Sequence, residues 1–384
     1  MLSKPKDEEV IEEDDWNLPS NFDLYSTHQI RKVYYSRKRS RQSSENTSRQ
    51  QEPAAATAAC AATPYFQVEC IEPSSPLDIL NKSQSLKKYD ATGHCCWTGA
   101  FLLISCIDEV LTVIDNQFYM KNRSNEGDSS SLNENILEGS SNMIELGCGT
   151  GIGGLAVMLA SNSETDDAGN GVNKDSKSQK IAKCCFTDYD PAVLEVCRRN
   201  CQLNDLIEGE SYSIQELTWG DNIDCVQCTQ NETQRFDIIL ATDVLYDVDL
   251  IPPLFSTVSK LLSINDNDDK QKNKNVDEKN FHGSSDQDNT SDGIFILSHV
   301  PRACYNDNNP PEAIEDLEQY IIDQAKDNYG LQLIDVIRPS SSSSIASSLE
   351  CEGGAEKLLH NGIDSYSDSA ILIFVRSNNN DLKR

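Results

Sequence analysis

The residues best suited to cofactor chemistry form a short glycine-rich segment near the middle of the chain. Glu145 ends a short apolar run, and Gly147, Gly149 and Gly151 follow at alternate positions. Glycine permits positive φ angles and lets a ligand approach the backbone closely. A strand, a tight turn and a helix start in this order are typical of a nucleotide-type cofactor site at the carboxyl edge of a sheet.

Two cofactor classes are compatible with these glycines. The spacing Gly149-x-Gly151-x-x-Gly154 fits the dinucleotide fingerprint, which indicates a nicotinamide or flavin enzyme. Glu145 and the alternating glycines instead match in full the E-x-G-x-G-x-G loop of S-adenosylmethionine (SAM) methyltransferases. Asp188 ends the next predicted strand and suits a ribose diol, which both cofactors contain. We favour the methyltransferase, and the dinucleotide enzyme stays open as the alternative.

A second candidate group follows the fourth predicted strand of the main sheet. Asp243 and Tyr246 stand at D-x-x-Y spacing, and an acid and a phenol there could hold an amine acceptor beside the cofactor's methyl group. The alternative is that Asp243 caps a helix and Tyr246 packs. Base-modifying methyltransferases carry Asn/Asp-Pro-Pro-Tyr/Phe at this place to stack a flipped base. Val244 and Leu245 replace both prolines, which disfavours a base as the substrate.

The hydrophobic pattern alternates between strand-like and helix-like segments, and this alternation positions the candidate residues. It predicts an α/β fold with one doubly wound, seven-stranded, Rossmann-like sheet and an antiparallel edge strand. Right-handed crossovers put the loops after the first, second and fourth strands at one edge. The expected strands are 65–72, 142–146, 182–187, 212–217, 236–241, 293–298, 331–337 and 370–376, and the expected helices are 98–111, 153–161, 191–204, 251–263 and 311–329.

Composition indicates one folded domain with long polar excursions. The hydrophobic content of 38% over 384 residues is enough for one sizeable core. Residues 1–63 read as a disordered N-terminal segment, and 64–384 as the SAM-dependent methyltransferase domain. Tracts rich in Ser, Asn, Asp or Gly interrupt that domain where loops tolerate insertion. We place these insertions near 121–140, 161–180, 263–292 and 340–368.

Charge and length of the apolar runs limit the partners. The net charge is −29, and residues 181–262 alone carry fourteen acidic against five basic residues. Nucleic-acid binding normally shows a basic footprint, so nucleic acid is a poor candidate, whereas a basic protein would be steered favourably. No apolar run reaches the length of a membrane span, and we expect no membrane association. The oligomeric state is not indicated.

Cysteine usage and the N-terminus point to the cytoplasm, the nucleus or both. The start of the chain is acidic, unlike a secretory signal. The fourteen cysteines are therefore expected as reduced thiols. A basic patch at 36–41 has the composition of a nuclear import signal. Cys225 and Cys228 form a lone C-x-x-C pair, which does not support a zinc site, and we expect no metal.

Four ordered blocks between 89 and 376 resemble one known family. They are T-G-H-C-C-W-T-G-A-F-L-L from Thr92, I-E-L-G-C-G-T-G from Ile144, E-L-T-W-G from Glu216 and D-V-L-Y from Asp243. In these blocks the chain is similar to the methyltransferase-like (family 16), non-SET protein-lysine methyltransferases of the seven-β-strand class. The resemblance implies a class I SAM methyltransferase fold, SAM as the cofactor and a lysine side chain of a protein as the acceptor.

The resemblance also implies where each block acts. Trp97 borders the methionine end of SAM, Asp188 takes the ribose, and Trp219 and Thr242 flank the adenine side. With the glycine loop, the expected cofactor-binding residues are Trp97, Glu145, Gly147, Cys148, Gly149, Gly151, Asp188, Trp219 and Thr242.

Asp243 and Tyr246 are expected at the acceptor as catalytic residues. The reacting amine must be neutral, although a free lysine has a pKa of about 10.4. An anion favours the charged ammonium, so we expect Asp243 to capture and orient the amine without acting as a strong base. An arginine or small-molecule methyltransferase on the same fold and a non-catalytic SAM-fold interaction module remain the alternatives.

Overall fold

The computed structural model describes residues 28–34, 64–71, 91–124, 140–163, 180–220, 236–273, 293–301, 316–339 and 369–376. A seven-stranded sheet organises this part of the chain in the order β5-β4-β3-β6-β7-β9-β8. Its strands are β3 (Ser140–Leu146), β4 (Lys180–Asp188), β5 (Tyr212–Glu216), β6 (Ile238–Thr242), β7 (Ile294–His299), β8 (Leu331–Ile337) and β9 (Ala370–Arg376). The first five strands of that order pair in parallel, and β9 pairs antiparallel with both β7 and β8. The predicted fold class is thereby confirmed, with the antiparallel strand second from the edge.

Successive residues of each central strand face opposite sides of the sheet and enter different cores. Ile238 and Ile294 belong to one hydrophobic cluster, and their neighbours Ile239 and Phe295 belong to the other. Every residue of β6 and of β7 is buried. Continuous apolar runs are expected where helices cover both faces of a parallel sheet.

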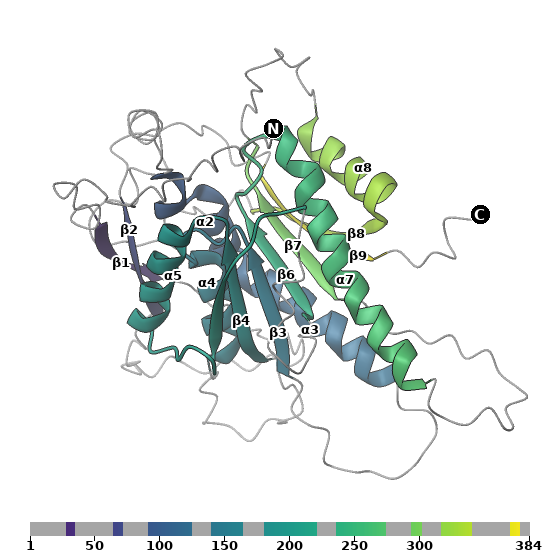
Figure 1. Ribbon diagram of the computed structural model, residues 1–384, viewed down its shortest axis with the longest axis horizontal. Coiled ribbons are helices and arrows are strands. Elements are labelled where there is room, and N and C mark those ends of the chain that lie inside the picture. The colour runs from purple at the N-terminus through teal and green to yellow at the C-terminus, as the bar shows by residue number, and fades with distance from the viewer. Residues whose placement is uncertain are drawn as a thin grey trace, which may run out of the picture.

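Helices cover both faces, as Figure 1 shows. One core contains residues of α2 (Thr98–Ser105), α3 (Ile107–Ser124), α4 (Ile152–Asn162) and α5 (Pro191–Leu203). The other contains residues of α7 (Ile251–Asn273) and α8 (Leu317–Tyr329). Short 3-10 turns, η2 (Ala91–His94) and η3 (Val248–Leu250), precede α2 and α7.

The helix predicted over 98–111 is wrong in one respect, because two helices occupy this region. They are bent by 64° at Cys106. The Ser105 hydroxyl donates to the carbonyl of Leu102, and the Cys106 N–H is shared between the carbonyls of Leu102 and Leu103. Such local competition weakens the regular helical ladder. Among the described residues no single helix is long and apolar enough to cross a membrane. The bent pair taken together has the length and the composition of a membrane span, and nothing further indicates one.

A strand lies inside the N-terminal segment that we expected to be disordered, so that prediction is wrong for β1 (His28–Tyr34). β1 pairs antiparallel with β2 (Tyr65–Ile71) along its full length, and the two form a separate ribbon. Val33 on β1 and Phe66 on β2 are buried in the core shared with α2 to α5. β1 gains its order from a partner more than thirty residues away, which no local pattern reveals.

Three helices differ from their predicted lengths. α7 continues ten residues past 263 into the expected insertion, because propagation from its buried first half costs little. α8 begins at Leu317, where Asp316 caps it, and not at 311. α3 ends at Ser124 and not at 111, so it reaches into the tract expected over 121–140. The remaining bounds differ from the predicted ones by at most two residues. Most of each polar tract lies outside the described residues, as do the basic patch and the C-x-x-C pair.

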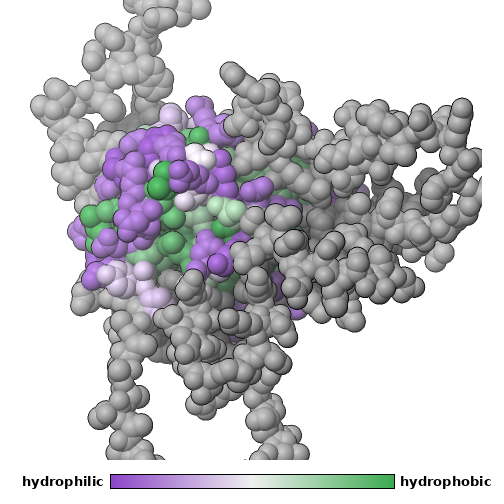
Figure 2. All heavy atoms as spheres, turned by 90° about the horizontal axis from the view of Figure 1, so that it is seen from below, coloured by the Kyte–Doolittle hydropathy of each residue, from purple (hydrophilic) through white to green (hydrophobic). Residues whose placement is uncertain are grey.

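The surface of the described part is mixed. Seen from below, hydrophilic side chains surround a more hydrophobic middle (Figure 2). Seven large hydrophobic or aromatic side chains are exposed, and two of them stand next to predicted site residues or are such residues themselves. The seven are Ile30, Tyr65, Tyr189, Ile207, Tyr246, Tyr320 and Ile334.

An aromatic cluster between α7 and the sheet gives a test of the second core. Phe255 lies 6.0 Å from the ring centroids of both Phe295 and Phe374 and 5.9 Å from that of Tyr329. Phe255→Ala should lower the free energy of unfolding by about 3–5 kcal/mol, because it leaves a cavity among rings that cannot collapse. Denaturant unfolding followed by circular dichroism measures this loss. Tyr320→Ala, at an exposed position on α8, is the control, and equal losses in the two variants would contradict the packing described.

Candidate active site

The candidate site lies at the carboxyl edge of the parallel strands. The glycine loop leaves β3 and leads into α4, Asp188 ends β4, and Asp243 directly follows β6. Because β4, β3 and β6 are neighbours in parallel, these segments converge at one edge, as the sequence predicted.

Three glycines of the loop adopt backbone angles that other residues avoid. Gly147, Gly149 and Gly151 have φ angles of 65°, 52° and 78°. A Cβ on Gly147 would lie 2.9 Å from the Trp219 ring, and one on Gly149 would lie 3.1 Å from the carbonyl of Gly93. Both constraints together explain why this turn requires glycine.

Glu145 and Thr242 support the loop from behind. The Glu145 carboxyl has no exposed surface and accepts from the Gly154 N–H over 3.0 Å and from the Thr242 hydroxyl over 3.4 Å. A Cβ on Gly153 would approach a Glu145 oxygen to 2.6 Å, so α4 rests directly on this carboxyl. Contact of either side chain with a cofactor stays a prediction, and the geometry gives both a supporting role.

Burial has a large effect on Glu145. It raises the pKa of the Glu145 carboxyl to about 8, against the opposing effect of its two donors. Burial likewise raises the pKa of the Cys148 thiol to about 12, so this side chain packs as a neutral group. The Cys148 N–H donates to the carbonyl of Thr187 over 2.8 Å, which ties the loop to β4.

Asp188 lies in front of the loop with its carboxylate toward the backbone. It accepts from the Gly149 N–H over 3.1 Å and from the Asp190 N–H over 3.2 Å. Burial raises the pKa of the Asp188 carboxyl, and these N–H groups act in the opposite direction. Its exposed fraction of 7% leaves an opening toward a ligand that Glu145 lacks.

Aromatic side chains surround this acid and the loop. Trp219 is partly buried and stands over Gly147, next to Val244. Tyr189 follows Asp188 directly and exposes 52% of its surface. Tyr189 was not predicted from the sequence, although an aromatic residue directly after the acid expected at the ribose is recognisable there. An exposed ring here suits stacking on a base.

Asp243 forms a closed set of hydrogen bonds with two residues outside its motif. Its carboxylate accepts from the N–H of Gly99 in α2 over 2.9 Å, and its own N–H donates to the carbonyl of Ser298 over 2.9 Å. The Ser298 hydroxyl in turn donates to the carbonyl of Gly99 over 2.6 Å. Asp243 has a φ of 57°, in the left-handed region that residues other than glycine seldom adopt, which points to a constrained site.

Asp243 therefore caps α2, as the alternative interpretation of the motif has it. The same contact holds the start of α2 beside the motif. Trp97 precedes α2 and donates its indole N–H to the carbonyl of Thr92 over 2.8 Å. The α2 start that Asp243 holds therefore carries Trp97. Tyr246 follows Asp243 by three residues and exposes 51% of its surface. The chemistry of these groups suits an amine held between a carboxylate and aromatic rings.

The residues present fit SAM. A carboxylate at the end of β4 can accept from ribose hydroxyls, and glycines keep the adjoining backbone free of side chains. Exposed aromatic rings at Tyr189 and Tyr246 suit an adenine base and a cationic acceptor. In the described part of the chain, no three His, Cys, Asp or Glu side chains are arranged to hold a metal ion.

The elevated pKa of Glu145 predicts how stability depends on pH. Its ordinary value is 4.5 and its folded value about 8, so the folded state binds the proton more tightly. The contribution of Glu145 to stability is therefore fully present below pH 4.5, its unfolded pKa. It is lost as the pH rises from there through the folded pKa of about 8. Relative to Glu145→Gln, the wild-type free energy of unfolding should fall by up to about 1.4 kcal/mol per pH unit in this window.

Urea unfolding of the two proteins between pH 5 and 9 measures this difference. Glutamine keeps an oxygen to accept from Gly154 and gives an N–H that can donate to Thr242, so the variant should fold. Glu109→Gln, at an exposed position on α3, is the control. A constant difference between wild type and Glu145→Gln across the range would show that Glu145 is ionised in the folded state.

Comparison with known proteins identifies the family. A search of curated protein sequences found no match. Solved structures with similar folds include a TehB-like SAM-dependent methyltransferase from Corynebacterium glutamicum, at 12% identity and a TM-score of 0.34, covering 79% of this chain and 100% of that one. Magnesium protoporphyrin IX methyltransferase from Synechocystis with bound S-adenosylhomocysteine is similar at 12% identity and a TM-score of 0.34, covering 70% of this chain and 82% of that one.

Because these identities and TM-scores are low, the family assignment rests on sequence. A family profile described as lysine methyltransferase matches residues 88–282. This match contains the glycine loop, Asp188 and the D-x-x-Y motif. It spans just over half of the 384 residues, so the chain belongs to the lysine methyltransferase family and is a methyltransferase that uses SAM.

Proposed function

We propose that this enzyme transfers a methyl group to a lysine side chain of a protein substrate. The observation that carries the proposal is the position of the D-x-x-Y motif, Asp243 to Tyr246, at the carboxyl end of β6, where its Val244 approaches the glycine loop. Val244, between them, would be 3.0 Å from a Cβ on Gly147. The acceptor residues thus adjoin the cofactor loop through the motif's own side chains. The family match supports lysine as the acceptor.

The residues that would hold the cofactor follow from the same geometry. Asp188 would accept from the ribose hydroxyls, Gly147 and Gly149 would adjoin the cofactor through their bare backbone, and Tyr189 and Trp219 would border the adenine. When bound, SAM supplies a methyl group on a sulfonium centre, which a neutral amine attacks in line. Positioning is then the main contribution that the protein makes.

Asp243 is suited to orientation and not to strong base catalysis. Deprotonating a free lysine at pH 7 costs roughly 4–5 kcal/mol. A carboxylate beside the amine favours the ammonium, so the enclosed surroundings and the nearby cation must lower that cost. One Asp243 oxygen accepts from Gly99, and a carboxylate has further acceptor positions for an amine. The same group therefore fixes α2 and can orient the substrate.

The charge of the chain supports a basic substrate. The net charge of −29 favours approach of a lysine- or arginine-rich segment, and such steering weakens as salt rises. Exposed aromatic side chains such as Tyr246 also suit a cationic side chain.

Methyl transfer into a matched cell extract tests the proposal. Extract from cells that lack this protein is incubated with the enzyme and SAM labelled in its methyl group. We expect a labelled protein, with the methyl group located on lysine nitrogen by mass spectrometry. Label on arginine or in small molecules only would refute the lysine assignment while keeping the methyltransferase. Absence of label from an enzyme that binds SAM would favour an interaction module.

Asp243→Asn should distinguish the effect of the negative charge of Asp243 from the effect of its hydrogen bond to the start of α2. The amide oxygen can still accept from Gly99, so the fold and SAM affinity should be kept, while methyl transfer falls by roughly 100-fold because the amine loses its anion. Asp243→Ala should also lose about 1 kcal/mol of stability with the cap. Single-turnover transfer, SAM titration and thermal unfolding measure the three quantities.

Asp316→Asn is the matched control, because Asp316 caps α8 by accepting from the Gln319 N–H over 3.0 Å. It should leave transfer and SAM affinity unchanged. Equal losses of transfer and SAM affinity in Asp243→Asn would refute the role of Asp243 in orienting the acceptor.

A further inference from the structure

The N-terminal ribbon is attached to α5 by two side-chain amides. Asn204 accepts from the N–H of Gln67 over 2.8 Å and donates to its carbonyl over 2.6 Å. Asn200, one turn earlier on α5, makes the same pair of bonds with the N–H and carbonyl of Glu69. Each amide thus pairs with β2 as a neighbouring strand would, on a strand whose other partner is β1.

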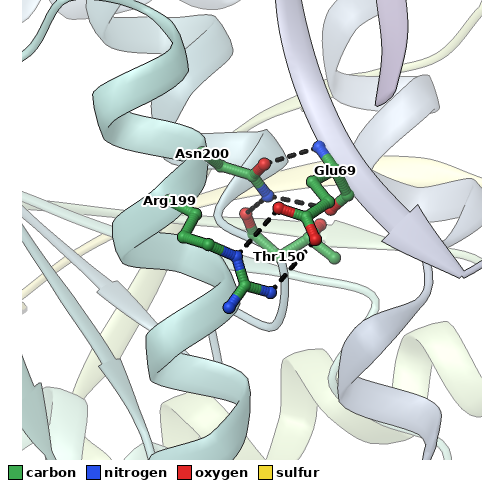
Figure 3. A network of polar contacts seen from close by, with 4 residues as sticks. All are labelled: Glu69, Thr150, Arg199 and Asn200. Carbon is green, nitrogen blue, oxygen red and sulfur yellow. Dashed lines mark hydrogen bonds and ion pairs between the residues drawn. The ribbon is translucent and has the colours of Figure 1, made fainter. Parts of the chain in front are cut away.

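One of the two amides also reaches the cofactor loop. Asn200 donates to the carbonyl of Thr150 over 2.8 Å, and Figure 3 shows it between Glu69 and Thr150. Asn204 donates instead to the carbonyl of Asn200 over 2.8 Å. Of the two amides, Asn200 is therefore the one that links the ribbon with the glycine loop.

The linking amide is enclosed and fully used. Asn200 and Thr150 have exposed fractions of 0% and 1%. The carboxamide of Asn200 has two N–H groups and one oxygen, and its bonds to Glu69 and Thr150 employ both kinds of group. A buried polar group that loses a partner is costly, so the amide holds both elements in one arrangement.

Further contacts hold the ribbon in the same position. Arg199 binds the Glu69 carboxylate through two nitrogens, at 2.8 and 3.1 Å (Figure 3). Cys96, directly before Trp97, lies 3.7 Å from the Thr150 hydroxyl, and the neighbouring Cys70 thiol of β2 raises the pKa of the Cys96 thiol. Thr150 is therefore contacted on its carbonyl and on its hydroxyl by groups that also contact β2.

Thr150 occupies a sensitive place in the loop. It stands between Gly149 and Gly151, whose φ angles are both positive. A bond to its carbonyl fixes the peptide plane between Thr150 and Gly151, and with it the path of the backbone from Asp188's partner Gly149 to the start of α4.

We propose that Asn200 is a positioning residue for the SAM loop, and that through it the β1–β2 ribbon belongs to the cofactor site. The ribbon precedes the residues 88–282 that match the family. The inference rests on SAM as the cofactor, so SAM binding by the wild-type protein is measured first. The ribbon sets how well the loop is formed before the cofactor arrives, and does not itself touch reacting groups.

The test compares Asn200→Asp with Asn204→Asp in the full chain. Both variants keep an oxygen to accept from the ribbon and both lose N–H donation, so both should lower the melting temperature. Only Asn200→Asp should weaken SAM binding, by about 10-fold, because only it places an oxygen against the Thr150 carbonyl. Titration calorimetry with SAM and thermal unfolding measure the two effects.

Steady-state kinetics measures KM and kcat separately, and a loss of stability alone would not raise the KM for SAM. For Asn200→Asp, the KM for SAM should rise with the fall in affinity, and kcat at saturating SAM should change by less than about 3-fold. Amide exchange should speed up at Gly149 to Gly151 in this variant and stay at the wild-type rate in Asn204→Asp.

The possible results distinguish a failure of the role of Asn200 from a failure of the cofactor assignment. Equal SAM affinities for the two variants would overturn the role of Asn200, whether both are weakened or neither. Wild-type protein that does not bind SAM would overturn the cofactor assignment itself. If Asn200→Asp does not fold, Asn200→Ser and Asn204→Ser make the same comparison without a buried charge, since serine is too short to reach both former partners.

Discussion

The turn between β3 and α4 is the constraint on which the site depends, because several distant segments are packed against it. A Cβ on Gly147 would meet Trp219, one on Gly151 would lie 2.6 Å from the Cys197 sulfur, and one on Gly153 would meet Glu145. The segment after β5, α5 and β3 are thus packed against a backbone without side chains. The loop's shape is set by the fold around it, and the loop in turn fixes the start of α4.

The sheet was predictable because its strands carry strong local signals. β6 and β7 are continuous apolar runs, and the two cores divide their residues alternately between Ile238 and Ile239 or Ile294 and Phe295. The break at Cys106 and the strand β1 escaped prediction for different reasons. The break accompanies local hydrogen bonds of the Ser105 hydroxyl and the Cys106 N–H, which a hydrophobic pattern does not show. The strand β1 depends on β2, a partner more than thirty residues away.

The site was predictable where a motif is contiguous and was missed where a contact joins separate segments. The glycine loop, Asp188 and the D-x-x-Y motif were read from adjoining residues, and the fold brings them to one edge. Ser298 and Asn200 carry no such signal. A serine at a strand end and an asparagine within a helix are ordinary, and only the fold shows that one completes the Asp243 hydrogen bonds and the other reaches Thr150.

Burial distinguishes two acids on adjacent strands, Glu145 on β3 and Asp188 on β4, that the sequence motifs both assign to the cofactor. Glu145 is enclosed, is held by Gly154 and Thr242, and its pKa rises to about 8. Asp188 keeps a small exposed surface and accepts from backbone N–H groups, including that of Gly149. The exposed surface of Asp188 suits the expected contact with a ribose, whereas Glu145 has no exposed surface. Glu145 therefore governs the shape of the loop and the stability of the fold, and Asp188 is the acid available to the cofactor.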